Sequence, residues 1–243
     1  MTDPILLLTR PEAAARRFLA ELEVAAGRHL QAVIAPLLRI DEMTPPRPAT
    51  SPAGLILTSE RGARGAARMG YVGLPAWCVG PRTAQAAKAA GLEPLAGGGT
   101  AETLLAAILA APDTGPLLHL RGDHQRGELV ARLRAAGRDC AEALVYAQTA
   151  RPLSDEGRAL LDGTAPVVAP VFSPRSAALL AGCAPVAAPL ALVAISAAAA
   201  RPLAPLKARV TQATRPEAIA MIDATLEAHA TFGSMEHSRG SGA

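Results

Sequence analysis

Short runs of apolar residues alternate with longer, alanine-rich stretches that carry charged side chains. Each run is apolar throughout rather than at every second position, which predicts strands that are covered on both faces. The stretches between them begin with Thr, Ser or Pro and end at glycines such as Gly27, Gly91 and Gly137, as helices do. This order predicts parallel sheets covered by helices, an α/β fold. The predicted strands are residues 5–8, 30–35, 55–57, 76–79, 117–120, 167–172 and 190–195.

Two segments interrupt this alternation. Residues 38–40 precede a proline-rich crossing, and residues 144–147 have the composition of an exposed strand. If the two segments pair as a hinge ladder, residues 41–143 form one lobe, and residues 1–37 with 148–230 form the other. Residues 231–243 are small and polar, which predicts a disordered tail without a function.

Composition narrows the class of protein. The net charge is +3 and aromatic residues make up 2% of the chain, which argues against a nucleic-acid partner. The cysteines, Cys78, Cys140 and Cys183, are odd in number and far apart, which predicts free thiols in a reducing compartment. The N-terminus lacks a basic n-region, and prolines break the uncharged stretch 182–200, so we expect neither export nor a membrane span.

Four strand-to-helix turns carry the residues best suited to bind an anion. In an open parallel sheet, ligands gather at the carboxyl ends of strands, where the N–H groups of helix N-termini point outward. For any one turn alone, a plain N-cap role is the better explanation of these residues, whereas their recurrence in four turns favours binding. The turns are Thr9-Arg10-Pro11, Thr58-Ser59-Glu60, Val79-Gly80-Pro81-Arg82-Thr83 and Phe172-Ser173-Pro174-Arg175-Ser176.

Other kinds of site are poorly supported. The glycine-rich loop 96–102 lacks the lysine of a phosphate-binding P-loop, and His119 and His124 have neither helical spacing nor a third ligand nearby. We therefore predict no metal and no organic cofactor. Tyr146, one of two tyrosines, lies in the hinge strand. It suits packing there, and it also suits donating a hydrogen bond to a leaving oxygen.

Taken in order, these motifs resemble the uroporphyrinogen-III synthase family over nearly the whole chain. The resemblance implies two flavodoxin-like parallel-sheet lobes joined by a two-strand antiparallel linker. The motifs that carry it are Leu8-Thr9-Arg10-Pro11, Leu57-Thr58-Ser59, Cys78-Val79-Gly80-Pro81-Arg82-Thr83-Ala84, Gly98-Gly99-Thr100-Ala101-Glu102, Val145-Tyr146 and Phe172-Ser173-Pro174-Arg175-Ser176.

The resemblance also implies a reaction and its participants. Hydroxymethylbilane, a linear tetrapyrrole rich in carboxylates, would lose water and close with its last pyrrole ring inverted, as in heme, bacteriochlorophyll and cobalamin synthesis. The enzyme would be a cytoplasmic monomer that meets hydroxymethylbilane synthase transiently. Tyr146 would assist departure of the hydroxyl group. The residues expected to bind substrate are Thr58, Ser59, Gly80, Thr83 and Ser173, with Arg10 and Arg175 as weaker candidates.

One segment departs from the family. Ser196 and Ala199 stand where the family usually has glycine and threonine, so the C-terminal lobe is expected to hold the substrate differently. A non-catalytic two-lobed module that binds an anionic small molecule remains the alternative, and such a module has no need of a proton donor at Tyr146.

Overall fold

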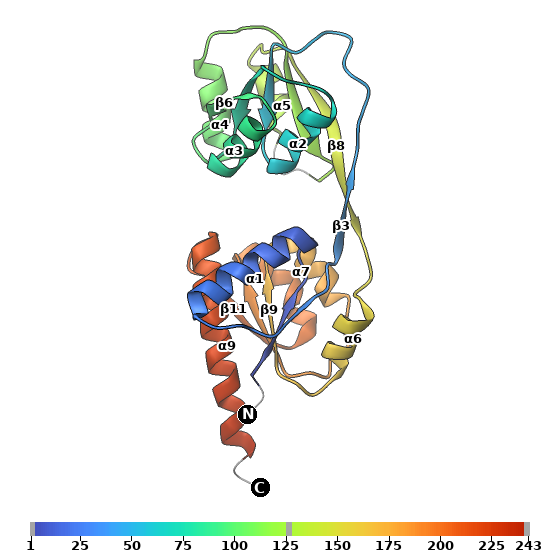
Figure 1. Ribbon diagram of the computed structural model, residues 1–243, viewed down its shortest axis with the longest axis vertical. Coiled ribbons are helices and arrows are strands. Elements are labelled where there is room, and N and C mark those ends of the chain that lie inside the picture. The colour runs from blue at the N-terminus through green and yellow to red at the C-terminus, as the bar shows by residue number, and fades with distance from the viewer. Residues whose placement is uncertain (1–2, 125–127, 241–243) are drawn as a thin grey trace. The chain divides into compact units, whose positions relative to one another are not determined.

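The computed structural model describes residues 3–124 and 128–240, with side chains as far as Phe232. The chain divides into two compact units (Figure 1). Lobe 1 comprises Met1–Arg39 and Ala150–Ala243, and lobe 2 comprises Ile40–Thr149. Lobe 1 is thus discontinuous in sequence, like the first lobe of the expected division.

Lobe 1 is a five-stranded parallel sheet with the order β11-β10-β9-β1-β2. If the five strands of this lobe are renumbered 1 to 5 in chain order, their order from the β2 edge is 2-1-3-4-5. This is the flavodoxin-like order. Its elements are β1 (Ile5–Leu8), α1 (Glu12–Ala26), β2 (Ala32–Ile34), α6 (Asp155–Asp162), β9 (Val167–Val171), α7 (Pro174–Ala181), β10 (Leu190–Ala194), α8 (Ala197–Ala200), a 3-10 helix (Arg201–Leu206), β11 (Arg209–Gln212) and α9 (Ala218–Gly240).

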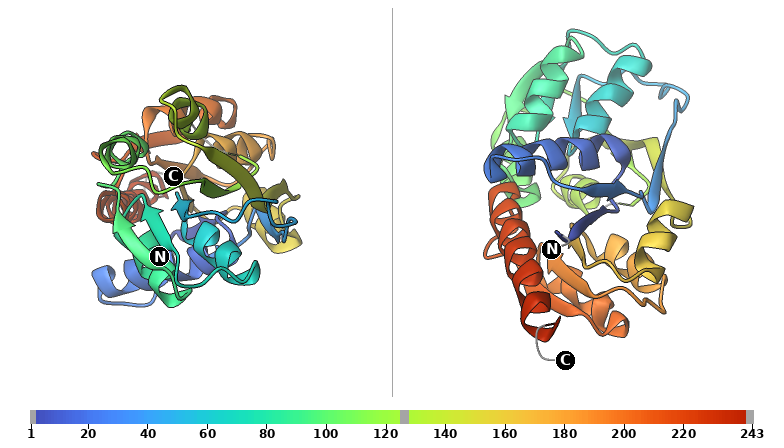
Figure 2. Two further views of the ribbon diagram at one scale, coloured as in Figure 1. Left: turned by 90° about the horizontal axis from the view of Figure 1, so that it is seen from above. Right: turned by 60° about the horizontal axis from the view of Figure 1, so that its bottom comes forward.

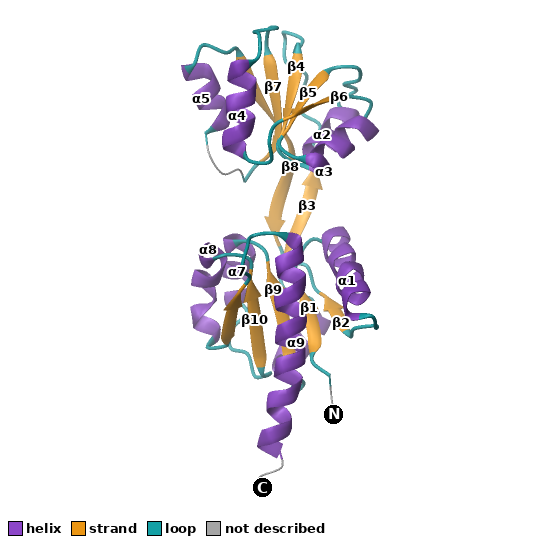
Figure 3. Ribbon diagram, turned by 90° about the vertical axis from the view of Figure 1, so that its left-hand side faces the viewer, coloured by secondary structure: helices purple, strands orange, loops and turns teal. Residues whose placement is uncertain are grey.

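Both faces of the lobe 1 sheet are buried, which is why its strands are continuously apolar. Alternate strand residues point to opposite faces. Leu6 and Leu8 pack with Phe18 of α1 and Met221 of α9, whereas Leu7 packs with residues of α6, α7 and α8. Figure 3 shows α1 and α9 on one side of this sheet and α7 and α8 on the other.

Lobe 2 has a six-stranded sheet with the order β3-β8-β7-β4-β5-β6, in which β8, β7, β4, β5 and β6 are parallel. Those five strands, counted along the chain, have the doubly wound order 3-2-1-4-5. The elements are β3 (Leu38–Glu42), β4 (Gly54–Leu57), α2 (Glu60–Arg68), β5 (Pro75–Cys78), α3 (Pro81–Ala89), β6 (Glu93–Ala96), α4 (Ala101–Ala110), β7 (Leu117–Gly122), α5 (Leu129–Ala135) and β8 (Cys140–Ala150).

The lobe 2 sheet also separates two apolar clusters. Leu55 and Leu57 pack on the face covered by α2 and α3, and Ile56 packs on the face covered by α4 and α5. The two connections that leave β4 and β7 therefore lie on opposite faces. The α/β class expected from the sequence is confirmed, and the residues expected for the linker, 38–40 and 144–147, lie within the neighbouring strands β3 and β8.

Some elements differ from the sequence prediction. The strands β6 and β11 have no counterpart in it, because edge strands with exposed, partly polar residues lack the apolar run that marks a buried strand. α9 includes residues 231–240, where we expected no order. This helix, red in Figure 2, lies along the lobe 1 sheet. Phe232 packs against the apolar cluster around Met221. Residues 241–243 of the expected tail lie outside the described residues.

Candidate functional site

Polar side chains of lobe 2 gather at the carboxyl edge of its sheet, around β4 and β7. The strand order reverses between these strands, and such a topological switch point is where open α/β sheets bind ligands, because the flanking helices diverge to opposite faces. Thr58 and Ser59 follow β4, and Gly122 ends β7. Tyr146 of β8 is in register with Gly122, so its side chain belongs to this same edge.

Ser59 and Tyr146 contact each other at the switch point. The Ser59 hydroxyl accepts a hydrogen bond of 3.2 Å from the Gly62 amide, which makes it the N-cap of α2, and its Oγ lies 3.4 Å from the Tyr146 Oη. Tyr146 is 9% exposed, and the Arg61 guanidinium lies 5.8 Å from the centre of its ring. The hydroxyl pair therefore stands beside a helix N-terminus and a cation, both of which favour an anion.

The Tyr146 ring lies directly against the backbone of Gly122. A Cβ atom added to Gly122 would lie 2.4 Å from the Tyr146 Cε2 and 2.9 Å from the Oη. Any side chain at position 122 would therefore displace the phenol, so the glycine sets the position of the hydroxyl group.

Thr58 points to the opposite face of the sheet and contacts His119. Its Oγ1 lies 3.2 Å from the His119 Nε2. His119 is fully buried, and burial lowers the pKa of its imidazole to about 4, partly opposed by Glu142 and reinforced by Arg121. The imidazole is neutral at pH 7, so it carries a single N–H group.

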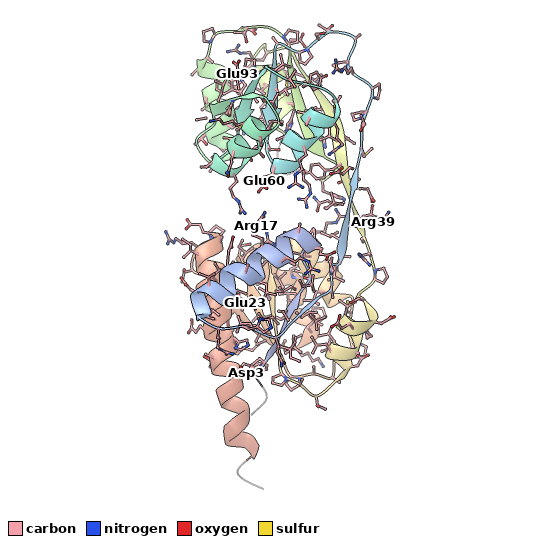
Figure 4. All side chains as sticks on the ribbon, in the orientation of Figure 1. Asp3, Arg17, Glu23, Arg39, Glu60 and Glu93 are labelled. Atoms are coloured by element: carbon pink, nitrogen blue, oxygen red, sulfur yellow. The ribbon has the colours of Figure 1, made fainter. Side chains whose placement is uncertain are left out.

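The next turn along the sheet edge begins α3. Gly80 is the N-cap residue and Pro81 opens the helix, so the amides of the first turn are not used within it. Thr83 lies in that turn and is 5% exposed. The glycine-rich loop beside it is ordered by the Gly99 amide, which donates to the Val79 carbonyl at 2.7 Å. At the neighbouring helix, Glu60, which is labelled in Figure 4, begins α2. Its carboxylate lies 3.5 Å from the Arg82 guanidinium and offsets that charge.

The switch point of lobe 1 lies between β1 and β9. Arg10 follows β1, and its guanidinium lies 3.8 Å above the ring of Phe172, the residue after β9. Ser173 caps α7 by accepting from the Ser176 amide at 3.1 Å, and the two serine Oγ atoms lie 2.9 Å apart. Arg175 is half-buried in the first turn of α7. A cation held on an aromatic ring beside a capped helix suits an anionic ligand.

The segment that departs from the family keeps a helix cap. The Ser196 hydroxyl accepts from the Ala199 amide at 3.4 Å, and Ala199 is fully buried in the lobe 1 core. Position 199 therefore contributes packing where a hydroxyl group was expected.

A metal site and a reactive thiol each place requirements on the described residues. Within residues 3–124 and 128–240, no three potential ligands among His, Cys, Asp and Glu lie together. Burial raises the pKa of the Cys78 and Cys140 thiols to about 11 and raises that of Cys183, so all three are protonated at pH 7. In the described part of the chain, no helix has the length and apolarity needed to cross a lipid bilayer.

The structure groups the predicted site residues within each lobe. Thr58, Ser59, Gly80, Thr83 and Tyr146 share the carboxyl edge of lobe 2, and Arg10, Ser173 and Arg175 share that of lobe 1. The sequence reading missed three residues: Gly122, Arg61 and His119. A histidine inside an otherwise apolar strand run was the available signal for His119, whereas nothing in the sequence marked the contact of Gly122 with Tyr146.

Doubly wound lobes with hydroxyl groups, helix N-termini and arginines at their switch points are typical of α/β proteins with sites for anionic small molecules. A model of the family described as uroporphyrinogen-III synthase HemD matches residues 19–223, which include every predicted site residue except Arg10. The chain belongs to the uroporphyrinogen-III synthase family. It is a cyclising lyase of tetrapyrrole biosynthesis.

One solved structure shares this fold. The crystal structure of uroporphyrinogen-III synthetase from Helicobacter pylori 26695 is similar with a TM-score of 0.65 and 14% identity, covering 92% of this chain and 99% of that chain. A mutant uroporphyrinogen III synthase from the extremely thermophilic bacterium Thermus thermophilus gives a TM-score of 0.47 and 17% identity, covering 94% of this chain and 99% of that chain. A comparison with curated proteins gives no match.

Proposed function

We propose that the chain converts hydroxymethylbilane into uroporphyrinogen III, with Tyr146 as the proton donor. Membership in the family supports the reaction. The single observation that carries the assignment of Tyr146 is its position, with the phenol at the switch point of lobe 2 and 3.4 Å from the Ser59 hydroxyl.

The reaction breaks the C–O bond of the hydroxymethyl group, and the electron pair stays on oxygen. A proton from the Tyr146 phenol turns that group into water. The methylene carbon left by the hydroxyl group then bonds to the substituted α-carbon of the last pyrrole ring, and the bond from that α-carbon to its bridging methylene breaks. The bridging methylene re-bonds at the free α-carbon of the same ring, which inverts the ring. The proton lost from that free carbon balances the one that Tyr146 supplied. Because the net change is the loss of one water molecule without oxidation or reduction, the reaction requires no redox cofactor.

The substrate carboxylates need N–H and O–H donors. In lobe 2 the first-turn amides of α2 and α3 supply them, together with Ser59 and Thr83. In lobe 1 the candidates are Ser173, Arg10 and Arg175, and the ring of Phe172 holds Arg10 in place. Because linear hydroxymethylbilane also closes spontaneously without inversion, the enzyme must favour one geometry of ring closure over the other.

The same proposal includes the oligomeric state, the compartment and the partner of the enzyme. It works as a monomer in the cytoplasm and receives hydroxymethylbilane through transient contact with hydroxymethylbilane synthase. Sedimentation of the purified chain alone and with that enzyme measures both points. A stable oligomer would contradict the monomer.

The decisive experiment supplies enzymatically made hydroxymethylbilane and separates the uroporphyrin isomers after oxidation. We expect isomer III in excess of the control without protein. Isomer I alone, together with retention of the tetrapyrrole by the protein, would instead indicate the non-catalytic binding module.

Replacing Tyr146 by Phe tests the proton donor. Loss of a general acid typically lowers turnover by about 100-fold or more, and we expect at least a roughly tenfold loss for Tyr146→Phe with an unchanged circular dichroism spectrum. The matched control is Tyr71→Phe, because Tyr71 is similarly buried and its hydroxyl has no partner among the described residues. Equal turnover of the two variants would remove Tyr146 from the mechanism.

A further inference from the structure

His119 determines how the Thr58 hydroxyl group can be used. It is fully buried beneath the switch point of lobe 2, and its two ring nitrogens face different neighbours. The Nε2 lies 3.2 Å from the Thr58 Oγ1, within hydrogen-bond distance. The Nδ1 lies 3.9 Å from the Glu142 Oε1, and this nitrogen has no hydrogen-bond partner in the described part of the chain.

Glu142 is held in place from its other side. Arg121 donates to the Glu142 Oε2 at 2.9 Å, which keeps the second carboxylate oxygen turned toward the imidazole. At 3.9 Å that oxygen is too far for a good hydrogen bond, but its negative charge still acts on the ring. A neutral imidazole carries one proton, and the nearby carboxylate favours its location on Nδ1.

A proton on Nδ1 leaves Nε2 as an acceptor. The Thr58 hydroxyl must then donate its only hydrogen to His119, so that its oxygen lone pairs alone remain for a ligand. A carboxylate only accepts hydrogen bonds and cannot pair with such an oxygen. A pyrrole N–H or the substrate's own hydroxyl group can.

We infer that His119 is a positioning residue that makes Thr58 a hydrogen-bond acceptor, so that Thr58 faces an N–H or O–H group of the linear tetrapyrrole rather than a carboxylate. This inference rests on the proposed function and narrows it. It replaces the anion contact expected for the turn that contains Thr58, and it leaves the carboxylate contacts proposed for Ser59 and Thr83 unchanged. A hydrogen bond from a pyrrole N–H to Thr58 forms in only one orientation of that ring. Ring inversion changes this orientation.

The tautomer of His119 is directly measurable. Long-range ¹H–¹⁵N spectra of the labelled full-length chain at pH 7 distinguish a proton on Nδ1 from one on Nε2, and the signals are assigned by their loss in His119→Gln or, should that variant not fold, by their shift in Thr58→Ser. We expect the Nδ1 proton. A proton on Nε2 overturns the inference.

The Glu142 charge provides a second readout that a purely structural histidine would not show. Glu142→Gln should shift the His119 nitrogen signals toward the Nε2-protonated form, whereas Glu93→Gln, an exposed carboxylate at the start of β6, should leave them unchanged. Unchanged signals in Glu142→Gln would overturn the role given to that carboxylate.

Kinetics test the contact with substrate. Thr58→Val should lower kcat/KM for hydroxymethylbilane by about tenfold, mainly through KM, which corresponds to one hydrogen bond. Thr58→Ser should retain activity within about threefold, because serine keeps the same donor and acceptor. Thr211→Val in the edge strand β11 is the matched control. Full activity of Thr58→Val overturns the inference alone, whereas the absence of isomer III from the unaltered enzyme overturns the proposed function.

Discussion

At the scale of single residues, the site depends on one close approach. Tyr146 occupies the space above Gly122 that a side chain would need, and its hydroxyl thereby reaches the Ser59 cap. Both residues lie at the end of the lobe 2 sheet. A bulge between Arg121 and Gly122 shifts the register of β7 and β8 there, so that Gly122 pairs with Tyr146. The bulge and the glycine together fix the position of the phenol.

Gly122→Ala should therefore weaken both stability and turnover. The added Cβ would approach the Tyr146 ring to 2.4 Å, and such overpacking costs about 1–3 kcal/mol in free energy of unfolding. Urea denaturation and the isomer assay measure the two effects. Gly80→Ala is the control for stability, because a Cβ there would meet its nearest heavy atom at 4.0 Å. Wild-type values for Gly122→Ala would show that the close approach is unimportant.

At the scale of elements, the same capping chemistry occurs within the site and outside it. Ser59 caps α2 at the lobe 2 switch point, and Ser154 caps α6 in lobe 1. Each serine hydroxyl accepts a hydrogen bond of 3.2 Å from a backbone amide of its helix. Comparing Ser59 with Ser154 therefore distinguishes the contribution of a capping hydroxyl group to helix stability from its contribution to catalysis.

Ser59→Ala and Ser154→Ala should each lower the free energy of unfolding by about 1 kcal/mol, the usual effect of losing an N-cap. Only Ser59→Ala should also lower turnover, because its hydroxyl adjoins Tyr146. Chemical denaturation and the isomer assay give the two numbers for each variant. If both variants keep full turnover, Ser59 is a helix cap and nothing more.

The sequence predicted the buried elements better than the exposed ones. The runs that became β1, β4, β7 and β10 are buried on both faces, so burial selects the apolar residues that make a strand visible. The edge strands β6 and β11 are held by backbone hydrogen bonds to the strands beside them, so they do not require apolar side chains. The switch-point turns were predictable from hydroxyl and proline positions. The pairing of Thr58 with His119 was not, because it depends on the register of β4 and β7.

At the scale of the whole molecule, each lobe has its own pair of apolar clusters, so the unfolding of each lobe can be measured separately. Trp77, the single tryptophan, lies in β5 and packs against the lobe 2 cluster around Ile56. Its fluorescence therefore reports the unfolding of lobe 2, which also contains His119.

Lobe 2 should lose stability in mild acid. Burial lowers the pKa of His119 from 6.5 to about 4, so between these values the unfolded chain binds a proton that the folded chain does not. The stability is complete above pH 6.5 and declines as the pH falls toward 4. Between pH 7 and pH 5 the loss is about 2 kcal/mol. Urea denaturation followed by Trp77 measures it, and His119→Gln should reduce this dependence.

The division of lobe 1 into two segments has a consequence for synthesis on the ribosome. Residues 1–39 emerge before lobe 2, but β1 meets its partner β9 only after Val171 has been made, and by then all of lobe 2 has been translated. Lobe 2 can therefore fold on the nascent chain while Leu6, Leu7 and Leu8 still lack half of the sheet that buries them. β1 thus leaves the ribosome before every strand of lobe 2 and yet completes its pairing after them, so chaperones that bind apolar segments have long access to it.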